Sequence, residues 1–176
     1  MRSGHDDPVT GAGTDRKSNR IGGRPLTSNE IVEARKVFAD RIDYGAVRIV
    51  ASRYLPWQPR YYVITPDHRI FWPGAGADLV AGEGGRHRCR FIHEMTHVMQ
   101  HQHGLWLRLR AGCLQVLHFG TGKLYDPYRY TCREGKPFSA YNLEQQAELA
   151  VAIYRGELPD FIDYGPCPPR QSGPPI

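Results

Sequence analysis

The residues from Phe91 to His103 read FIHEMTHVMQHQH and divide into two opposite faces when they are placed on a helix. At about 100° per residue, the large apolar side chains share one arc of the helix: Phe91, Ile92, Met95, Val98 and Met99. On the other side lie His93 and His97, with Glu94 and His101 beside them. The segment therefore predicts an amphipathic helix that must bury its apolar face and presents imidazoles on its polar face.

The spacing of the first two histidines suits a metal ion. Residues at i and i+4 lie one turn apart on the same face, so His93 and His97 can direct nitrogen atoms at one shared point. Glu94 lies further round the helix, where its carboxylate can reach a water molecule on the metal. A His-Glu-x-x-His motif thus supplies two ligands and a base, which is the arrangement of zinc peptidases. We predict that His93 and His97 bind Zn²⁺ and that Glu94 is the catalytic base.

A catalytic zinc usually takes a third protein ligand. His103 has the spacing of the third histidine in the metzincin pattern, His-Glu-x-x-His-x-x-Gly-x-x-His. However, Gln100 stands where that pattern has glycine, and the chain has no later methionine for a Met-turn. A straight helix would place His103 about a quarter turn off the ligand face, and His101 about 12 Å along the axis from His93. A metzincin-like peptidase with His103 as third ligand is the alternative to the assignment that follows.

A second amphipathic segment offers a carboxylate instead. YNLEQQAELAVAIYRGE, residues 141–157, carries apolar residues at helical spacing: Leu143, Ala147, Ala150, Val151 and Tyr154. Glu144 borders this stripe, and Glu148 lies one turn further on. In glu-zincins a later helix supplies a glutamate ligand, and an acidic residue four positions on hydrogen-bonds a ligand histidine. We predict Glu144 as the third ligand and Glu148 as the group that fixes a histidine tautomer, with Glu148 as the fallback ligand.

The segments before the histidines predict one more helix and a small sheet. Thr27 and Glu30 form a capping box at the start of a helix that continues to about Ile42. Three β-branched or aromatic runs follow, AVRIVASRYL, RYYVIT and RIFWP, separated by the turn sequences PWQP and PDH. We expect about three strands, with RIFWP as an edge that could pair with an extended peptide.

Length and composition predict one domain. The 176 residues suffice for a single hydrophobic core. We expect a disordered leader at 1–22, a folded domain at 23–164 and a disordered Pro/Gly tail at 165–176. The start has no apolar core of a signal peptide, and no run approaches the roughly 18 apolar residues of a membrane span. A location in the bacterial cytoplasm, or delivery by a specialised secretion system, is the expectation.

The charged residues and the cysteines argue against a nucleic-acid-binding protein and against a zinc knuckle. The net charge of +5 is scattered along the chain, so we expect no nucleic-acid partner, and we expect a monomer. The four cysteines are widely spaced, without a Cys-x-x-Cys pair: Cys89, Cys113, Cys132 and Cys167. They predict free thiols rather than a zinc knuckle, although a bridge between Cys113 and Cys132 stays open.

Three segments in this order resemble the Vgr-related zinc metallopeptidases: RPLTSNEIVEARKVFADRIDYGAVRI, FIHEMTHVMQHQHG and YNLEQQAELA. Members of this bacterial group include toxic domains attached to type VI secretion spike proteins. The resemblance covers roughly residues 23 to 158. It implies a compact zincin-like α+β fold, zinc on His93, His97 and a downstream glutamate, and hydrolysis of peptide bonds. The partners that it implies are a peptide or protein substrate, a type VI secretion spike protein and an immunity protein.

The expected architecture is therefore a small antiparallel sheet, an active-site helix that carries the histidines, and a C-terminal helix that carries the glutamate. Glu94 would take a proton from the attacking water and pass it to the leaving amine. Tyr141 and the tyrosines of YDPYRY, residues 125–130, are candidates for stabilising the oxyanion. The alternative from another class is a binding or adaptor module in which zinc only staples the fold. A structural site of that kind needs four protein ligands, and no cysteine stands at a ligand spacing.

Overall fold

The structure, a computed structural model, describes residues 22–82, 84–105 and 135–165. Nearly all of the predicted leader and tail, the YDPYRY segment, and the cysteines at 113, 132 and 167 lie outside these ranges. The described elements, in chain order, are β1 (Arg24–Pro25), α1 (Ser28–Phe38), the 3₁₀ turn η2 (Tyr44–Ala46), β2 (Arg48–Val50), β3 (Arg69–Phe71), α2 (Gly85–Gln102), the 3₁₀ turn η3 (Phe138–Ala140) and α4 (Leu143–Tyr154). None of the described helices combines the length and the apolar character needed to cross a bilayer.

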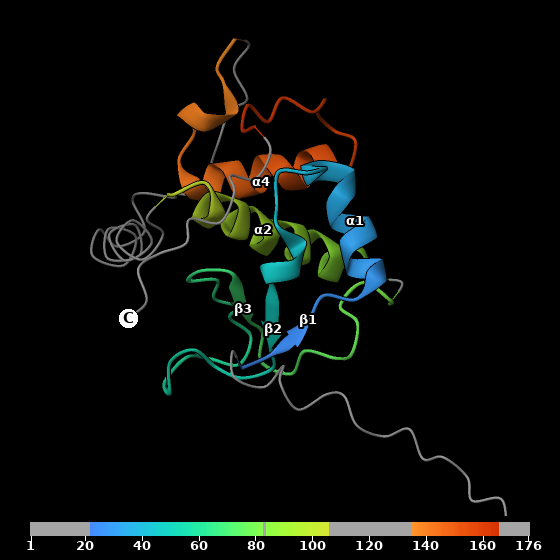
Figure 1. The fold of residues 1–176 in the computed structure, drawn as a ribbon, viewed down its shortest axis with the longest axis vertical. Coiled ribbons are helices and arrows are strands. Elements are labelled where there is room, and N and C mark those ends of the chain that lie inside the picture. Colours follow the sequence, from blue (N-terminus) through green and yellow to red (C-terminus); the bar gives the residue numbers. More distant parts are fainter. Residues whose placement is uncertain (1–21, 83, 106–134, 166–176) are drawn as a thin grey trace, which may run out of the picture.

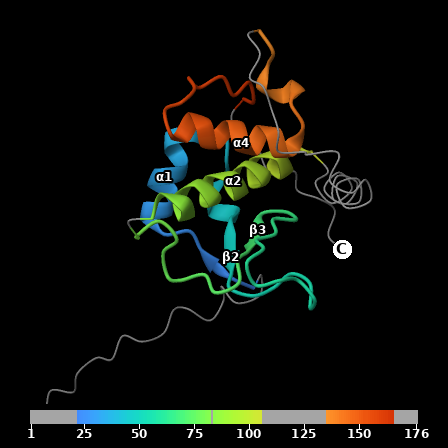
Figure 2. The same ribbon diagram turned by 180° about the vertical axis from the view of Figure 1, so that it is seen from behind.

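The elements form a small α+β arrangement (Figure 1). Helices α2 and α4 lie side by side, and the sheet lies on the side of α2 away from α4. Helix α1 packs near one end of both helices, and the view from behind shows the same order (Figure 2). Helix α2 is therefore covered on two sides, which explains why so much of its surface is buried.

The first helix begins where the sequence predicts. The Thr27 side chain accepts a hydrogen bond from the Glu30 amide at 3.1 Å, and the Glu30 carboxylate accepts one from the Thr27 amide at 2.9 Å, which confirms the capping box. Glu30 is fully buried, and its carboxylate also pairs with Arg24 at 2.7 Å and accepts from the Leu79 amide at 2.8 Å. One carboxylate thus joins the start of α1 to β1 and to the loop that precedes α2.

The sheet is mixed, so the expectation of an antiparallel sheet is wrong for one of its two pairings. Its strand order is β1-β2-β3; β1 pairs with β2 antiparallel, and β2 pairs with β3 parallel. In the register, Ile49 lies opposite Ile70, and both side chains are buried. A parallel pair needs a long connection, and residues 51–68 supply it between β2 and β3.

The run RYYVIT does not form the predicted strand. Only Ile64 pairs with the sheet, through two backbone hydrogen bonds to Phe71 of 3.1 and 2.9 Å, so the edge of β3 is already occupied there. The buried Gln58 side chain accepts from the Tyr54 amide and donates to the Tyr62 carbonyl. These side-chain bonds hold the backbone in a loop and take groups that a strand ladder would have used. The third strand is instead β1, which the sequence analysis did not predict.

The core confirms the apolar faces predicted for the two long helices. All five apolar side chains of α2 are fully buried: Phe91, Ile92, Met95, Val98 and Met99. The α4 stripe is buried as well, apart from the partly exposed Tyr154: Leu143, Ala147, Ala150 and Val151. Because both helices turn these faces inward, the residues at the edges of the faces meet between them.

Candidate metal centre

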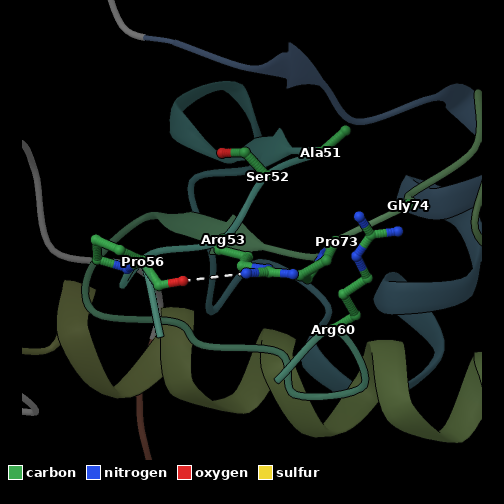
Figure 3. Close-up of a pocket in the computed structure, with 7 residues that line it drawn as sticks. All are labelled: Ala51, Ser52, Arg53, Pro56, Arg60, Pro73 and Gly74. Carbon is green, nitrogen blue, oxygen red and sulfur yellow. Dashed lines mark hydrogen bonds between the residues drawn. The ribbon is translucent and has the colours of Figure 1, made fainter. Parts of the chain in front are cut away.

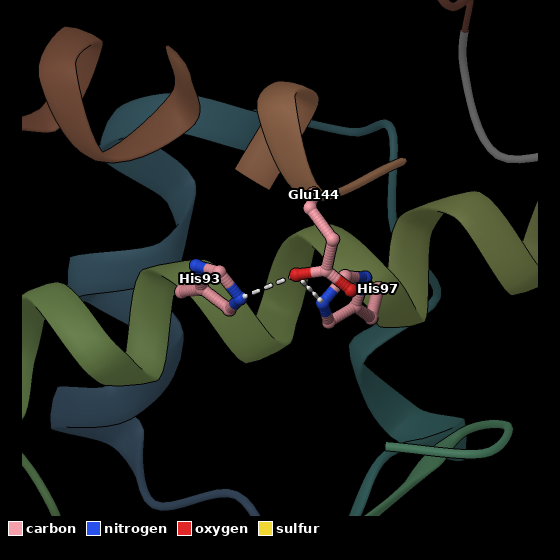
Figure 4. Close-up of side chains that lie close together, drawn as sticks. All are labelled: His93, His97 and Glu144. Carbon is pink, nitrogen blue, oxygen red and sulfur yellow. Dashed lines mark ion pairs between the residues drawn. The ribbon is translucent and has the colours of Figure 1, made fainter. Parts of the chain in front are cut away.

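Three side chains meet between α2 and α4. His93 and His97 come from α2 and Glu144 from the first turn of α4, and their potential ligand atoms all lie within 4.8 Å of one another (Figure 4). The Glu144 Oε2 atom lies 3.4 Å from His93 Nε2 and 3.6 Å from His97 Nε2. The two imidazole rings stand nearly perpendicular, with centroids 5.0 Å apart. This group is the one cluster of three such residues among the described parts of the chain.

The other nitrogen of each imidazole is held by an oxygen atom. His93 Nδ1 lies 3.0 Å from the Glu148 Oε1 atom, and His97 Nδ1 lies 2.9 Å from the Gln100 Oε1 atom. Carboxylate and amide oxygens only accept hydrogen bonds, so each Nδ1 carries the proton and donates it. When such an imidazole is neutral, its lone pair is therefore on Nε2, the nitrogen nearer Glu144.

Gln100 has a role that the sequence analysis missed. The sequence pattern marks Gln100 only as the residue that replaces the metzincin glycine, yet its side chain is fully buried beside the site. While its oxygen accepts from His97, its nitrogen donates to the Leu143 carbonyl at 2.9 Å and to the Gln146 Oε1 atom at 2.9 Å. Gln100 therefore ties the second histidine directly to the start of α4. Its position three residues after His97, on the same side of the helix, is the signal that could have revealed it.

The structure distinguishes the two candidate glutamates. Glu144 lies in the three-residue group, opposite both Nε2 atoms. Glu148 lies one turn further along α4 and contacts the Nδ1 atom of His93 instead. Glu148 therefore lies where the sequence predicts a partner that fixes a tautomer, and not where a fallback ligand would lie.

The histidines after His97 point elsewhere. The chain leaves the helix at His103, whose Nε2 atom donates to the Arg41 carbonyl at 3.0 Å and whose ring lies against Tyr164. The ring of His101 lies 6.2 Å from that of His68. Neither His101 nor His103 joins the three-residue group, so this geometry does not support the metzincin-like alternative.

Burial and charge act against each other in the group. Burial alone would lower the pKa of the His93 imidazole, but the Glu144 and Glu148 carboxylates outweigh it and raise this pKa to about 10. For His97 burial again acts to lower the pKa, and Glu144 outweighs it, so the pKa lies above its ordinary value. Burial would raise the pKa of Glu144, but the two imidazoles hold it well below its usual range. Without a bound cation, the carboxylates thus favour the protonated form of both imidazoles.

Glu94 lies beside the group and is held by a residue that the sequence analysis did not identify. The Thr65 hydroxyl donates to the Glu94 Oε2 atom at 2.7 Å, and both side chains are buried. The negative charge of Glu94 acts to raise the pKa of both His93 and His97, so it lies close to them. No partner of its Oε1 atom is found among the described residues. Thr65 therefore fixes one of the two carboxylate oxygens of Glu94. Thr65 carries no sequence signal, because it precedes Glu94 by 29 residues.

Tyr141 and Cys89 are the remaining predicted residues that the structure describes. Tyr141 is buried, its backbone carbonyl accepts from Gln146, and the Lys136 ammonium lies 3.8 Å from the centre of its ring. Cys89 is a free thiol whose sulfur accepts from the Arg155 guanidinium at 3.3 Å. Cys89 does not belong to the three-residue group.

Fold and site together define a small α+β domain that presents two histidines and a glutamate between two packed helices. The solved effector domain of VgrG2b from Pseudomonas aeruginosa is similar to it, with a TM-score of 0.70 and 38% sequence identity, over 77% of this chain and 75% of that one. The type VI secretion system spike protein VgrG2b of P. aeruginosa PAO1 is 41% identical over 132 residues. That alignment covers 72% of this chain but only 12% of the spike protein. No protein-family model matches. The chain belongs to the family of the VgrG2b effector domain.

Proposed function

We propose that this chain is a zinc-dependent metallopeptidase. The observation that carries the proposal is the group of His93, His97 and Glu144 with the buried carboxylate of Glu94 beside it. Catalytic zinc sites take three protein ligands from nitrogen and oxygen donors and keep one position open, whereas structural sites close with four. Among the described residues no fourth histidine, cysteine or carboxylate joins the group, which favours the catalytic kind over an adaptor stapled by zinc.

The spacing of the donor atoms fits a zinc ion. Ligands about 2.1 Å from a tetrahedral zinc lie roughly 3.4 Å from each other. The two separations between Glu144 Oε2 and the imidazole Nε2 atoms are 3.4 and 3.6 Å, too long for good hydrogen bonds. The hydrogen bonds to both Nδ1 atoms leave both Nε2 lone pairs available for such an ion. A bound zinc would act as a Lewis acid and lower the pKa of water to about 7.

Glu94 would perform the proton transfers. With its Oε2 atom held by Thr65, its Oε1 atom would accept a proton from the water that attacks the scissile carbonyl. The same carboxyl group would then give this proton to the departing amine, which leaves the carboxylate ready for another cycle. His93, His97 and Glu144 would hold the metal, while Glu148 and Gln100 would keep the two imidazoles oriented.

The biological setting that we propose is type VI secretion. The related chain segment in P. aeruginosa is the effector domain of a spike protein, and this chain spans 12% of the length of that protein. We infer that the chain acts as a toxic effector that travels with a spike protein and that the producing cell holds it in check with an immunity protein. Its substrate would be a peptide or a protein.

The replacement Glu94→Gln tests the proposal. The purified variant should keep close to one zinc per chain, because the ligands are unchanged, while hydrolysis of mixed protein substrates falls to background. Wild-type activity should likewise disappear with a chelator and return with added zinc. Elemental analysis and the release of peptide fragments are the measurements. A wild-type chain that holds zinc and cleaves nothing would favour the adaptor alternative.

Two further replacements check the ligands in the same assays. Glu144→Ala should strip zinc from the protein, because one of three donors is lost. His103→Ala should leave the zinc content unchanged, because His103 faces the Arg41 carbonyl. The opposite pair of results would revive the metzincin-like alternative.

A further inference from the structure

A cluster of exposed aromatic side chains lies on the segment of residues 51–62, which we call the aromatic loop. Large apolar side chains are usually buried, but four on this loop are exposed: Trp57 at 77%, Tyr61 at 69%, Tyr62 at 44% and Tyr54 at 39%. Within the described parts of the chain, Val32 is the one other large hydrophobic residue exposed to this degree. Such a concentration in a single short segment marks an interaction surface rather than ordinary exposure.

The aromatic loop also lines a pocket. The pocket has a volume of about 650 Å³ and lies between the loop and the residues that follow β3 (Figure 3). Its walls include Arg53, Pro56 and Arg60 from the loop and Pro73 from the other side. This volume is typical of a site for a small ligand or for a few side chains of a larger one.

Within the described ranges, neither arginine of the pocket is paired with a carboxylate. Arg53 donates to the Pro56 carbonyl at 3.0 Å, and neither Arg53 nor Arg60 forms an ion pair with a described residue. The sequence from 51 to 66 contains no aspartate or glutamate at all. Some arginines of the fold are paired, such as Arg24 with Glu30, Arg41 with Asp160 and Arg69 with Asp67, whereas others, such as Arg48 and Arg88, bond backbone carbonyls instead. The pocket therefore presents two guanidinium groups that an external anion can reach.

The loop leads directly to the candidate metal centre. The Arg90 guanidinium on α2 donates to the Tyr61 carbonyl, and one helical turn further Glu94 accepts from Thr65. The chain from Tyr61 to Thr65 thus runs along α2 toward Glu94. The aromatic loop is therefore joined through four residues of chain to the contact that holds Glu94.

We propose that the aromatic loop and its pocket bind the acidic side chains of a polypeptide substrate, an inference that rests on the proposed function. A guanidinium group binds a carboxylate through two parallel hydrogen bonds, which a neutral side chain cannot reproduce. Exposed tyrosine, tryptophan and arginine are the residues that dominate binding at protein interfaces. An open pocket lined by two arginines also differs from the long basic groove that follows a nucleic-acid backbone. The loop therefore selects polypeptides with glutamate or aspartate near the bond to be cut.

The test uses the whole chain with Glu94→Gln, which should bind without cleaving. Its zinc-loaded form is titrated with two fluorescently labelled peptides, one rich in glutamate and the other with glutamine at the same positions. Anisotropy should show the acidic peptide bound about tenfold more tightly. Adding Arg60→Gln should remove most of this preference. Adding Arg86→Gln instead, which removes an exposed arginine outside the pocket, should leave the preference intact.

Several results would overturn the inference. Equal affinities for the two peptides would do so. So would a loss of the preference for the acidic peptide that is as large with Arg86→Gln as with Arg60→Gln. The third such result is an oligonucleotide that displaces the labelled acidic peptide better than the unlabelled acidic peptide does. Thermal unfolding of each variant checks that the fold is retained. Hydrolysis by the wild-type chain is scored separately. Cleavage without a preference for acidic peptides would refute this inference alone, whereas the preference without any cleavage would refute the proposed function and leave the binding site.

Discussion

At the scale of single residues, the ability of the site to bind a cation depends on which nitrogen of each imidazole faces Glu144. The two imidazoles each have one nitrogen bound to an oxygen of Glu148 or Gln100, and the other nitrogen faces Glu144. An imidazole that was free to rotate would divide its population between tautomers, and only part of that population could bind a cation. The orienting oxygens are therefore as much part of the site as the Nε2 atoms that face Glu144.

Thr65 gives the sharpest prediction at this scale. Thr65→Val keeps the shape of the side chain but removes the hydroxyl that holds Glu94, so kcat should fall about tenfold or more while KM changes little. Thr65→Ser keeps a hydroxyl and should restore most of kcat. Zinc content should be the same in both variants. Steady-state kinetics with elemental analysis make the comparison. A loss of thermal stability with an unchanged kcat would show that Thr65 only supports the loop.

At the scale of elements, the buried amides tie α2 to α4. Gln100 donates to the Leu143 carbonyl and to Gln146, and Gln146 donates to the Tyr141 carbonyl at 2.9 Å. The Tyr164 hydroxyl lies 3.3 Å from the oxygen of Gln146. Each amide thus uses both of its ends, which satisfies polar groups that burial would otherwise penalise. Since the histidines lie on one helix and Glu144 on the other, these bonds also set the distance between the candidate ligands.

Replacing Gln100 by leucine should therefore weaken zinc binding as well as the fold. His97 Nδ1 loses its acceptor, and the Leu143 carbonyl and Gln146 lose a donor. Zinc affinity should fall between about 10-fold and 100-fold, and the free energy of unfolding should fall by about 1–3 kcal/mol. Competition with a chromophoric chelator and denaturant unfolding measure the two effects.

The control is Gln102→Leu in the same helix. Gln102 bonds the backbone of Asp43 through both ends of its amide, at 2.8 and 3.1 Å. Its replacement should cost stability but leave the zinc affinity unchanged. If both variants lowered zinc affinity equally, the amide link would not be specific to the site.

At the scale of the whole molecule, the charges of the site make stability depend on pH. In the folded protein the pKa of His93 is about 10, against about 6.5 for an unfolded histidine. Between these values the folded state holds a proton that the unfolded state has lost, so stability is fully present below about pH 6.5 and is lost as the pH rises toward 10. The limit for one proton is about 1.4 kcal/mol per pH unit.

The pH dependence can be measured on protein that a chelator keeps free of metal. Its free energy of unfolding should decrease across this pH window, and Glu144→Gln should flatten the decrease because it removes the carboxylate that raises both imidazole pKa values. Added zinc must displace the protons, so its stabilising effect should grow with pH over the same range. Thermal midpoints between pH 6 and pH 10 test this. A midpoint that rises with pH in the chelator would contradict the ion pairs described here.

The sequence by itself determined the parts of this protein that depend on local periodicity. Helix α2 has its apolar residues on one side and its imidazoles on the other, because a helix repeats every 3.6 residues whatever surrounds it. The same reasoning found the stripe of α4, the capping box at Thr27 and the two candidate glutamates. Membership in the Vgr-related group also followed from sequence, because three motifs in a fixed order are specific.

Only the tertiary structure decided how the segments meet. Local periodicity could not show that Glu144 rather than Glu148 faces both Nε2 atoms, because that depends on how α4 is placed against α2. It could not show that Gln58 holds the RYYVIT run in a loop, or that Arg24–Pro25 forms a strand beside β2. Thr65 stayed hidden for the same reason: its bond to Glu94 joins residues far apart in the chain, and such a bond leaves no periodic trace. For Gln100, the spacing from His97 is local, but its bonds to Leu143 and Gln146 depend on how α4 is placed.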